Sequence, residues 1–161
     1  MRIVTRSGPV GSRATSFSVP SLMAKSATTT RSVGEFRSVF RWLRGIAKAH
    51  APLASVGEDA PTLYTLIAEV GPETVRLRGA KAAGTSMPVV YLKIGKSYVS
   101  FHLLGLYMNP SLEGQISAEL VKRKQGKACF NFRKEDSDLT KELRELTRKS
   151  IIALRSKGFI L

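Results

Sequence analysis

The chain has little of three things that narrow its chemistry: cysteine, acidic residues and long apolar runs. Its 161 residues include one cysteine, Cys129, which excludes an intramolecular disulfide and leaves no second cysteine for a CxxC metal site. No apolar run approaches the roughly 20 residues that a bilayer-spanning helix requires, so no membrane partner is expected. We therefore expect one soluble domain with its own core, in a reducing compartment such as the cytoplasm.

Acidic residues are scarce relative to basic ones. The chain has 12 Asp and Glu against 26 Lys and Arg, for a formal net charge of +14. This balance favours adsorption to nucleic acid or other anionic surfaces, and such binding should weaken in salt. Much of the excess lies in the first 48 residues, where Glu35 is the single acid. Charge alone therefore predicts weak nucleic-acid binding through basic residues, without a defined interface.

The motifs of common catalytic and nucleotide-binding sites are missing. There is no HExxH, no nucleophile elbow and no paired-carboxylate arrangement, and the stretch GAKAAGTS (79–86) lacks the GxxxxGK[ST] spacing of a phosphate loop. No RRM, KH or helix-turn-helix signature is recognisable. The sequence identifies no catalytic residue, metal site or cofactor, and an enzyme is not expected.

The strongest pattern is a β-hairpin over residues 87–107, followed by another strand over residues 127–132. Side chains alternate across a strand, and in each of these three strands one alternating set is wholly apolar. Gly95 and Lys96 are expected to form a two-residue turn, because glycine suits the first position of a type II′ turn. The apolar sets predict the core face of a sheet: Val90, Leu92, Ile94, Val99, Phe101, Leu103, Ala128, Phe130 and Phe132.

Helical spacing recurs near both ends of this region. Ser32 and Glu35 form a capping-box pattern before the first helix, Ser117 is the expected N-cap of a short helix over residues 118–124, and Gly158 is expected to end the last helix. His50 is the kind of lone histidine that packs at a helix end. The buried stripes are Phe36, Phe40, Leu43, Ala47 and His50 in the first helix, and Leu139, Leu143, Leu146, Ser150 or Ile151, and Leu154 in the last.

The remaining segments complete the predicted fold. Residues 51–60 are expected to form a connection, residues 63–70 a strand, and residues 74–78 a weak strand. The prediction is a single α+β domain over residues 32–161, with an antiparallel sheet of about four or five strands. An N-terminal helix, a short helix and a long C-terminal helix are expected to pack on one face of this sheet.

Residues 1–31 are rich in Ser, Thr, Arg and Gly, contain no acid and show no sustained periodicity. A disordered basic tail is therefore expected. Translation that starts at Met23 would make the first 22 residues an upstream extension, and this is the preferred explanation. A transit peptide, which is also rich in Arg and Ser, and a functional basic arm are the alternatives.

Polar side chains occupy the second alternating set of the predicted strands. They form one surface if the strands share a sheet with helices behind it. Antiparallel sheets commonly leave such a face in water, and the alternative is a face that binds a small anion or polar ligand. A binding module is the function that we favour, with candidate ligand-binding residues Tyr91, Lys93, Tyr98, Ser100, His102, Lys127 and Asn131, and with Cys129 on the same face.

Two other functions stay open. Tyrosines near lysines are the ingredients of a surface that stacks bases and binds phosphates, so a basic nucleic-acid-binding protein is the alternative. Cys129 would lie near His102 if their strands pair, and a thiolate beside an imidazolium is nucleophilic. No third orienting group is identifiable, so a structural cysteine is favoured over a cysteine-dependent enzyme.

Three segments carry a family resemblance: YLKIGKSYVSFHLLGLYMNPSL (91–112), ISAELVKRKQGKACFNF (116–132) and DSDLTKELRELTRKSI (136–151). They resemble small uncharacterised bacterial proteins related to the YdhG-like domain-of-unknown-function family, with residues 91–132 the specific part. The resemblance implies a compact α+β domain with an antiparallel sheet and no assigned reaction. Some YdhG-like members are linked to iron delivery in a frataxin-like role. We do not infer iron binding for this chain from the resemblance, because its acidic residues are few and scattered along the sequence.

Overall fold

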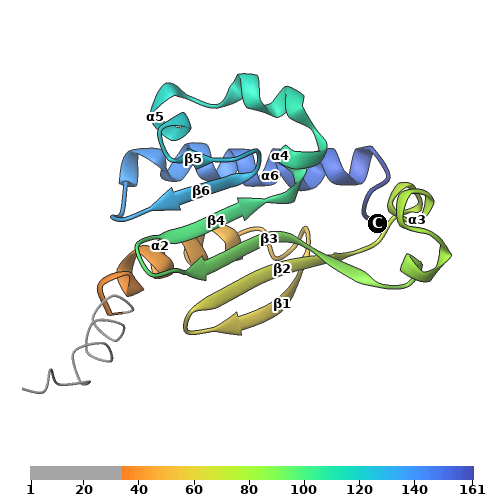
Figure 1. Ribbon diagram of the computed structural model, residues 1–161, viewed down its shortest axis with the longest axis horizontal. Helices are drawn as coiled ribbons and strands as arrows, with labels where there is room; N and C mark the ends of the chain where they lie inside the picture. The colour runs from red at the N-terminus through yellow and green to blue at the C-terminus, as the bar shows by residue number, and fades with distance from the viewer. Residues whose placement is uncertain (1–33) are drawn as a thin grey trace, which may run out of the picture.

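The computed structural model describes residues 34–161, so the predicted basic tail and the Ser32 cap lie outside the described residues. Within this range, six antiparallel strands form one open sheet in the order β1-β2-β3-β4-β6-β5 (Figure 1). The strands are β1 Ser55–Ala60, β2 Leu63–Glu69, β3 Ser86–Ile94, β4 Val99–Leu103, β5 Lys124–Gln125 and β6 Cys129–Phe132. The predicted α+β class is confirmed, with more strands than expected.

Five α-helices and three short 3-10 helices accompany the sheet in the described part of the chain. The α-helices are α2 Arg37–Lys48, α3 Pro72–Arg78, α4 Leu104–Met108, α5 Ala118–Val121 and α6 Thr140–Ser156. The 3-10 helices are η1 Ala80–Ala82, η2 Pro110–Gln115 and η3 Ser137–Leu139. Among residues 34–161, no helix is long and apolar enough to cross a bilayer.

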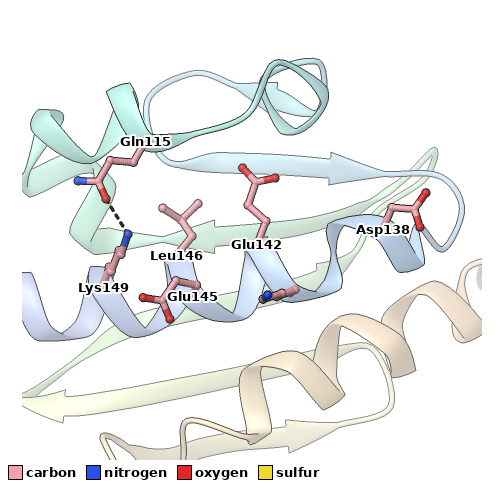
Figure 2. A pocket seen from close by; sticks show the side chains of 7 residues that line it. Gln115, Asp138, Glu142, Glu145, Leu146 and Lys149 are labelled. Atoms are coloured by element: carbon pink, nitrogen blue, oxygen red, sulfur yellow. Dashed lines mark hydrogen bonds between the residues drawn. The ribbon is translucent and has the colours of Figure 1, made fainter.

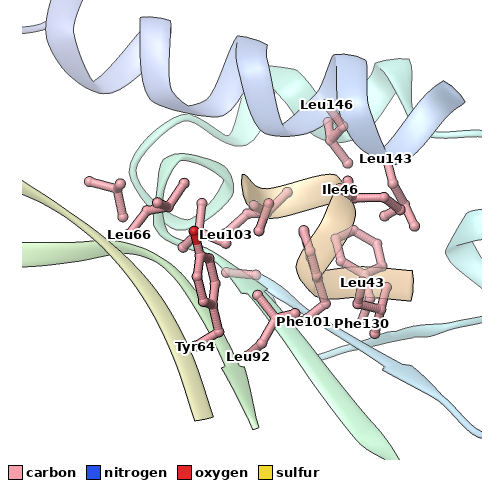
Figure 3. Packing of buried hydrophobic residues seen from close by; sticks show 14 of the residues in the cluster. Leu43, Ile46, Tyr64, Leu66, Leu92, Phe101, Leu103, Phe130, Leu143 and Leu146 are labelled. Atoms are coloured by element: carbon pink, nitrogen blue, oxygen red, sulfur yellow. The ribbon is translucent and has the colours of Figure 1, made fainter. Parts of the chain in front are cut away.

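Helices α2 and α6 cover one face of the sheet and enclose the core with it. The nine apolar residues predicted on the core face are all buried, as are the predicted stripes of both helices. Figure 3 shows side chains of α2 and α6 meeting the aromatic side chains of β4 and β6. Residues in this contact include Leu43, Ile46, Phe101, Phe130, Leu143 and Leu146.

The segment over residues 51–60, predicted as a connection, contains the edge strand β1. Its side chains are almost all exposed, so no alternation of apolar and polar residues marks it in the sequence. Backbone pairing with β2 holds it in place, interrupted by an irregularity between Val56 and Asp59. This segment is therefore a strand because its backbone pairs with β2, and such pairing produces no recognisable side-chain pattern in the sequence.

The weak strand predicted over residues 74–78 is wrong, because this segment is helix α3. Gly71 is its N-cap, Pro72 occupies the first turn, and Gly79 ends it with a φ of 90°. Proline at the start and a left-handed glycine after the end are the usual boundaries of a helix. Thr74 is buried, and its hydroxyl donates to the carbonyl of Phe159 at 2.7 Å.

The predicted two-residue turn at Gly95 and Lys96 is also wrong. Ile94 pairs with Val99, which leaves a four-residue loop over residues 95–98. The Gly95 amide donates to the carbonyl of Tyr98 at 2.8 Å. Gly95 does not adopt the positive φ that a type II′ turn requires.

Helices α4 and α6 approach each other most closely at Gly105. A Cβ atom at this position would lie 2.3 Å from both the backbone oxygen and the Oγ atom of Ser150. Glycine is therefore the residue that lets the backbones of these two helices come into contact.

The C-terminal residues return to the sheet after Gly158, whose φ of 73° ends the last turn. Ile160 forms an antiparallel bridge with Val70, and the Leu161 amide donates to the carbonyl of Glu69 at 3.0 Å. Ile160 is buried, whereas Leu161 is exposed. The three terminal residues thus extend the pairing of β2, beside α3 (Figure 1).

The short helix α5 is capped as predicted but ends at Val121, and Lys124 belongs to β5. The Ser117 Oγ atom accepts from the Leu120 amide at 3.2 Å. Glu142 of α6 accepts from the Ser117 amide and from its hydroxyl, both at 2.7 Å. This carboxylate ties the start of α5 to α6.

Candidate functional site

The sheet face opposite α2 and α6 carries a group of polar side chains, which we call the open face. Except for Thr65, which is buried, its members are half-buried or exposed, so their polar atoms can reach solvent or a ligand. The open face consists of Thr65, Tyr91, Lys93, Ser100, His102, Gln125, Cys129 and Asn131.

Two rows of directly opposed residues cross the open face. Opposed residues on neighbouring strands have Cβ atoms about 4.5–5.5 Å apart, so the side chains of each row lie against one another. The longer row crosses five strands at Thr65, Tyr91, His102, Cys129 and Gln125. The shorter row crosses three strands at Lys93, Ser100 and Asn131.

Tyr98 and Lys127 are the two candidate residues that do not belong to a strand. Their assignment to strands by alternation is wrong. Tyr98 lies in the loop over residues 95–98, where its ring packs beside Gly95. Lys127 lies in the turn between β5 and β6, with its Nζ atom 5.6 Å from the ring centroid of Tyr107, a cation–π contact.

Gln125 is a member of the open face that the sequence does not reveal. Strand β5 has two residues, which is too short for an alternating pattern. The amide nitrogen of Asn131 donates to Oε1 of Gln125, and the Cys129 thiol donates to Oδ1 of Asn131 at 3.7 Å. These contacts orient the two amide groups on the surface of β5 and β6.

Burial favours the uncharged forms of the two titratable groups at the centre of the longer row, His102 and Cys129. It lowers the pKa of His102, which favours the neutral imidazole. It also raises the pKa of the Cys129 thiol, an effect that the neighbouring Ser100 side chain partly offsets. Both pKa shifts disfavour a thiolate beside an imidazolium. The open face is therefore better suited to hydrogen bonding than to nucleophilic attack.

The lowered pKa of His102 predicts a pH-dependent stability. Below about pH 6.5 the His102 side chain binds a proton more readily in the unfolded chain than in the folded one. The free energy of unfolding should therefore decrease as the pH is lowered. One proton limits the slope to about 1.4 kcal/mol per pH unit. Between about pH 7.5 and pH 5, urea unfolding should show a smaller decrease in the free energy of unfolding for His102→Gln than for the unsubstituted chain. Parallel pH profiles for the two proteins would contradict the assignment.

A separate hollow of about 350 Å³ lies between η2 and α6 (Figure 2). Its polar groups already bind protein atoms: Lys149 donates to Gln115 at 2.8 Å, and Glu142 holds Ser117. Glu145 pairs with Arg148, and not with Lys149 as an i,i+4 pair would. These groups stabilise the fold and leave few free to bind a ligand.

His50 and the acidic residues also serve the fold. His50 is buried at the end of α2, with Nδ1 3.0 Å from the carbonyl of Ile46 and Nε2 2.9 Å from that of Arg144. It thereby links α2 to α6, in agreement with a packing histidine. Within residues 34–161, no group of three or more His, Cys, Asp or Glu side chains could hold a metal ion.

The open face thus combines an aromatic ring, a neutral imidazole, a hydroxyl, two amides and one lysine on adjacent strands. Comparisons with protein-family models, curated proteins and solved structures find no match for the chain, so its resemblance to the YdhG-like family stays a prediction.

Proposed function

We propose that this chain is a small binding module whose open face holds a flat, polar ligand that carries an anionic group. The observation that supports the proposal is the pair of cross-strand rows, which gathers Tyr91, Lys93 and Asn131 on three neighbouring strands. A solvated sheet face needs no such mixture of aromatic, amide and cationic groups.

Each group has a distinct role in this proposal. The Tyr91 ring provides an apolar wall for a flat ligand, and neutral His102 beside it provides one donor and one acceptor. Lys93 is exposed and provides the positive charge for a carboxylate or phosphate. The amides of Asn131 and Gln125 complete the hydrogen-bonding edge.

Ligand binding is tested with a thermal-shift panel of mononucleotides and aromatic carboxylates at about 0.15 M ionic strength, followed by calorimetry on any hit. A ligand that binds the folded state raises the melting temperature by mass action. Lys93→Ala and His102→Ala should each weaken binding by about tenfold, which corresponds to one charge-assisted hydrogen bond.

Lys127→Ala is the matched control, because Lys127 is a nearby lysine outside the strands whose ammonium group lies over the ring of Tyr107. It should leave affinity unchanged within about twofold, or about 0.4 kcal/mol. Equal losses in Lys93→Ala and Lys127→Ala would mean that the hit responds to general charge. A panel without a hit would favour the solvated-face interpretation.

A further inference from the structure

A groove of about 800 Å³ lies between α2 and the turn that joins β1 to β2. It is on the helical side of the sheet and does not include the open face. Its lining contains three arginines, one acid and several apolar residues. We call the arginines Arg37, Arg41 and Arg44 the rim; the acid is Asp59, and the apolar residues include Phe40, Ala60 and Pro61.

The arginines of the rim form one row along α2. Arg37, Arg41, Arg44 and Lys48 recur at spacings of four, three and four residues, which places them on one face of the helix. At a rise of about 1.5 Å per residue, this row is about 16 Å long. That length exceeds the size of a single phosphate or carboxylate and suits a chain of regularly spaced anions.

Two of these arginines have no acidic partner. Within residues 34–161, no carboxylate lies in salt-bridge distance of Arg37 or Arg41. Residues 1–33 contain no Asp or Glu and so cannot supply one. An anion from another molecule is therefore the complementary occupant.

Arg44 differs from its neighbours because it is fixed in place. Asp59 accepts from its Nε atom at 2.7 Å and from Nη2 at 2.5 Å, and the guanidinium lies 5.6 Å from the ring centroid of Tyr64. This bidentate contact uses two of the five N–H donors of Arg44 and leaves three for a ligand. The helix thus presents one oriented guanidinium and two free ones.

We propose that this groove binds single-stranded nucleic acid, with backbone phosphates on the arginine row and a base or sugar against the exposed ring of Pro61. Arginine recognises phosphate through paired N–H donors. A positively charged groove that follows the phosphate backbone is the part of single-strand binding that does not depend on sequence. Binding here does not depend on the open face.

The proposal is tested by fluorescence anisotropy of the full chain with a labelled oligothymidylate. The double variant Arg37→Gln/Arg41→Gln should bind about tenfold more weakly and lower the salt slope by about 1.4, or about 0.7 for each phosphate contact. Ser38→Asp places a carboxylate in the groove, in the first turn of α2, where the helix dipole tolerates it. It should also weaken binding severalfold.

Arg78→Gln/Lys81→Gln is the matched control, since it removes the same charge from α3 and η1 at the opposite end of the molecule (Figure 1). It should change affinity by less than about twofold, because salt screens cations that lie at the far end of the molecule from the groove. Equal losses in both double variants would show adsorption by overall charge and overturn the proposal. Absence of binding at about 0.15 M salt would also overturn it.

Discussion

Gly105→Ala is expected to lower the free energy of unfolding by about 3 kcal/mol or more, a large part of the roughly 5–15 kcal/mol that is usual for a folded domain. The added methyl group would lie 2.3 Å from the carbonyl oxygen of Ser150, so α4 and α6 must separate to admit it. Urea denaturation followed by circular dichroism measures the loss. The Gly105→Ala/Ser150→Ala double variant should remain destabilised, because the clash involves backbone as well as the Ser150 hydroxyl.

Gly45→Ala is the control for this substitution. Gly45 is exposed within α2, and no atom lies within 4 Å of a Cβ placed there. Alanine should therefore stabilise the protein by up to about 1 kcal/mol, because it is the better helix former. If Gly105→Ala were no more destabilising than Gly45→Ala, the close contact between α4 and α6 would be wrong.

Ile160→Ala is expected to cost about 2–4 kcal/mol, whereas Leu161→Ala should cost less than about 0.5 kcal/mol. The two residues are adjacent and similar in size, but Ile160 is 2% exposed and Leu161 is 59% exposed. Truncation at Ile160 leaves a cavity beside Val70, while truncation at Leu161 changes only a surface side chain. Thermal or urea unfolding of the two variants compares them directly. Similar losses would mean that the terminal residues do not pair with β2 as described.

Strong alternation made the centre of the sheet predictable. The core faces of β3, β4 and β6 follow from their apolar sets, because a one-residue slip would move every apolar side chain into water. The spacing of Phe40, Leu43 and Ala47 fixed the buried side of α2 in the same way. These elements can be recognised in the sequence because each buries one face, and burial requires apolar residues at regular spacing.

The elements that were not predicted correctly are determined by backbone pairing or bounded by glycine and proline. Strand β1 is exposed along nearly all its length, and β5 has two residues, so neither leaves a periodic signal. Helix α3 has its boundaries marked by Pro72 and Gly79, which also suit a turn. Local sequence therefore does not distinguish these alternatives.

The candidate site was predictable only where its residues lie in strands. Tyr91, Lys93, Ser100, His102 and Asn131 share the open face because their strands pair in the expected alternation. Tyr98 was assigned to a strand but lies in the hairpin loop, which is longer than two residues. The groove beside α2 could not be foreseen, because it forms where side chains of α2 meet the β1–β2 turn, and residues 51–60 were expected to form a connection.

The sheet order has a consequence for how the chain acquires its structure during synthesis. Strands β1, β2 and β3 each pair with the next strand in the sequence, so these pairs can form as they leave the ribosome. Helix α6, which covers much of their apolar face, is made after all these strands, and Ile160 can pair with Val70 only after α6 is complete. A chain that stops before Thr140 should therefore leave a large apolar surface exposed and aggregate.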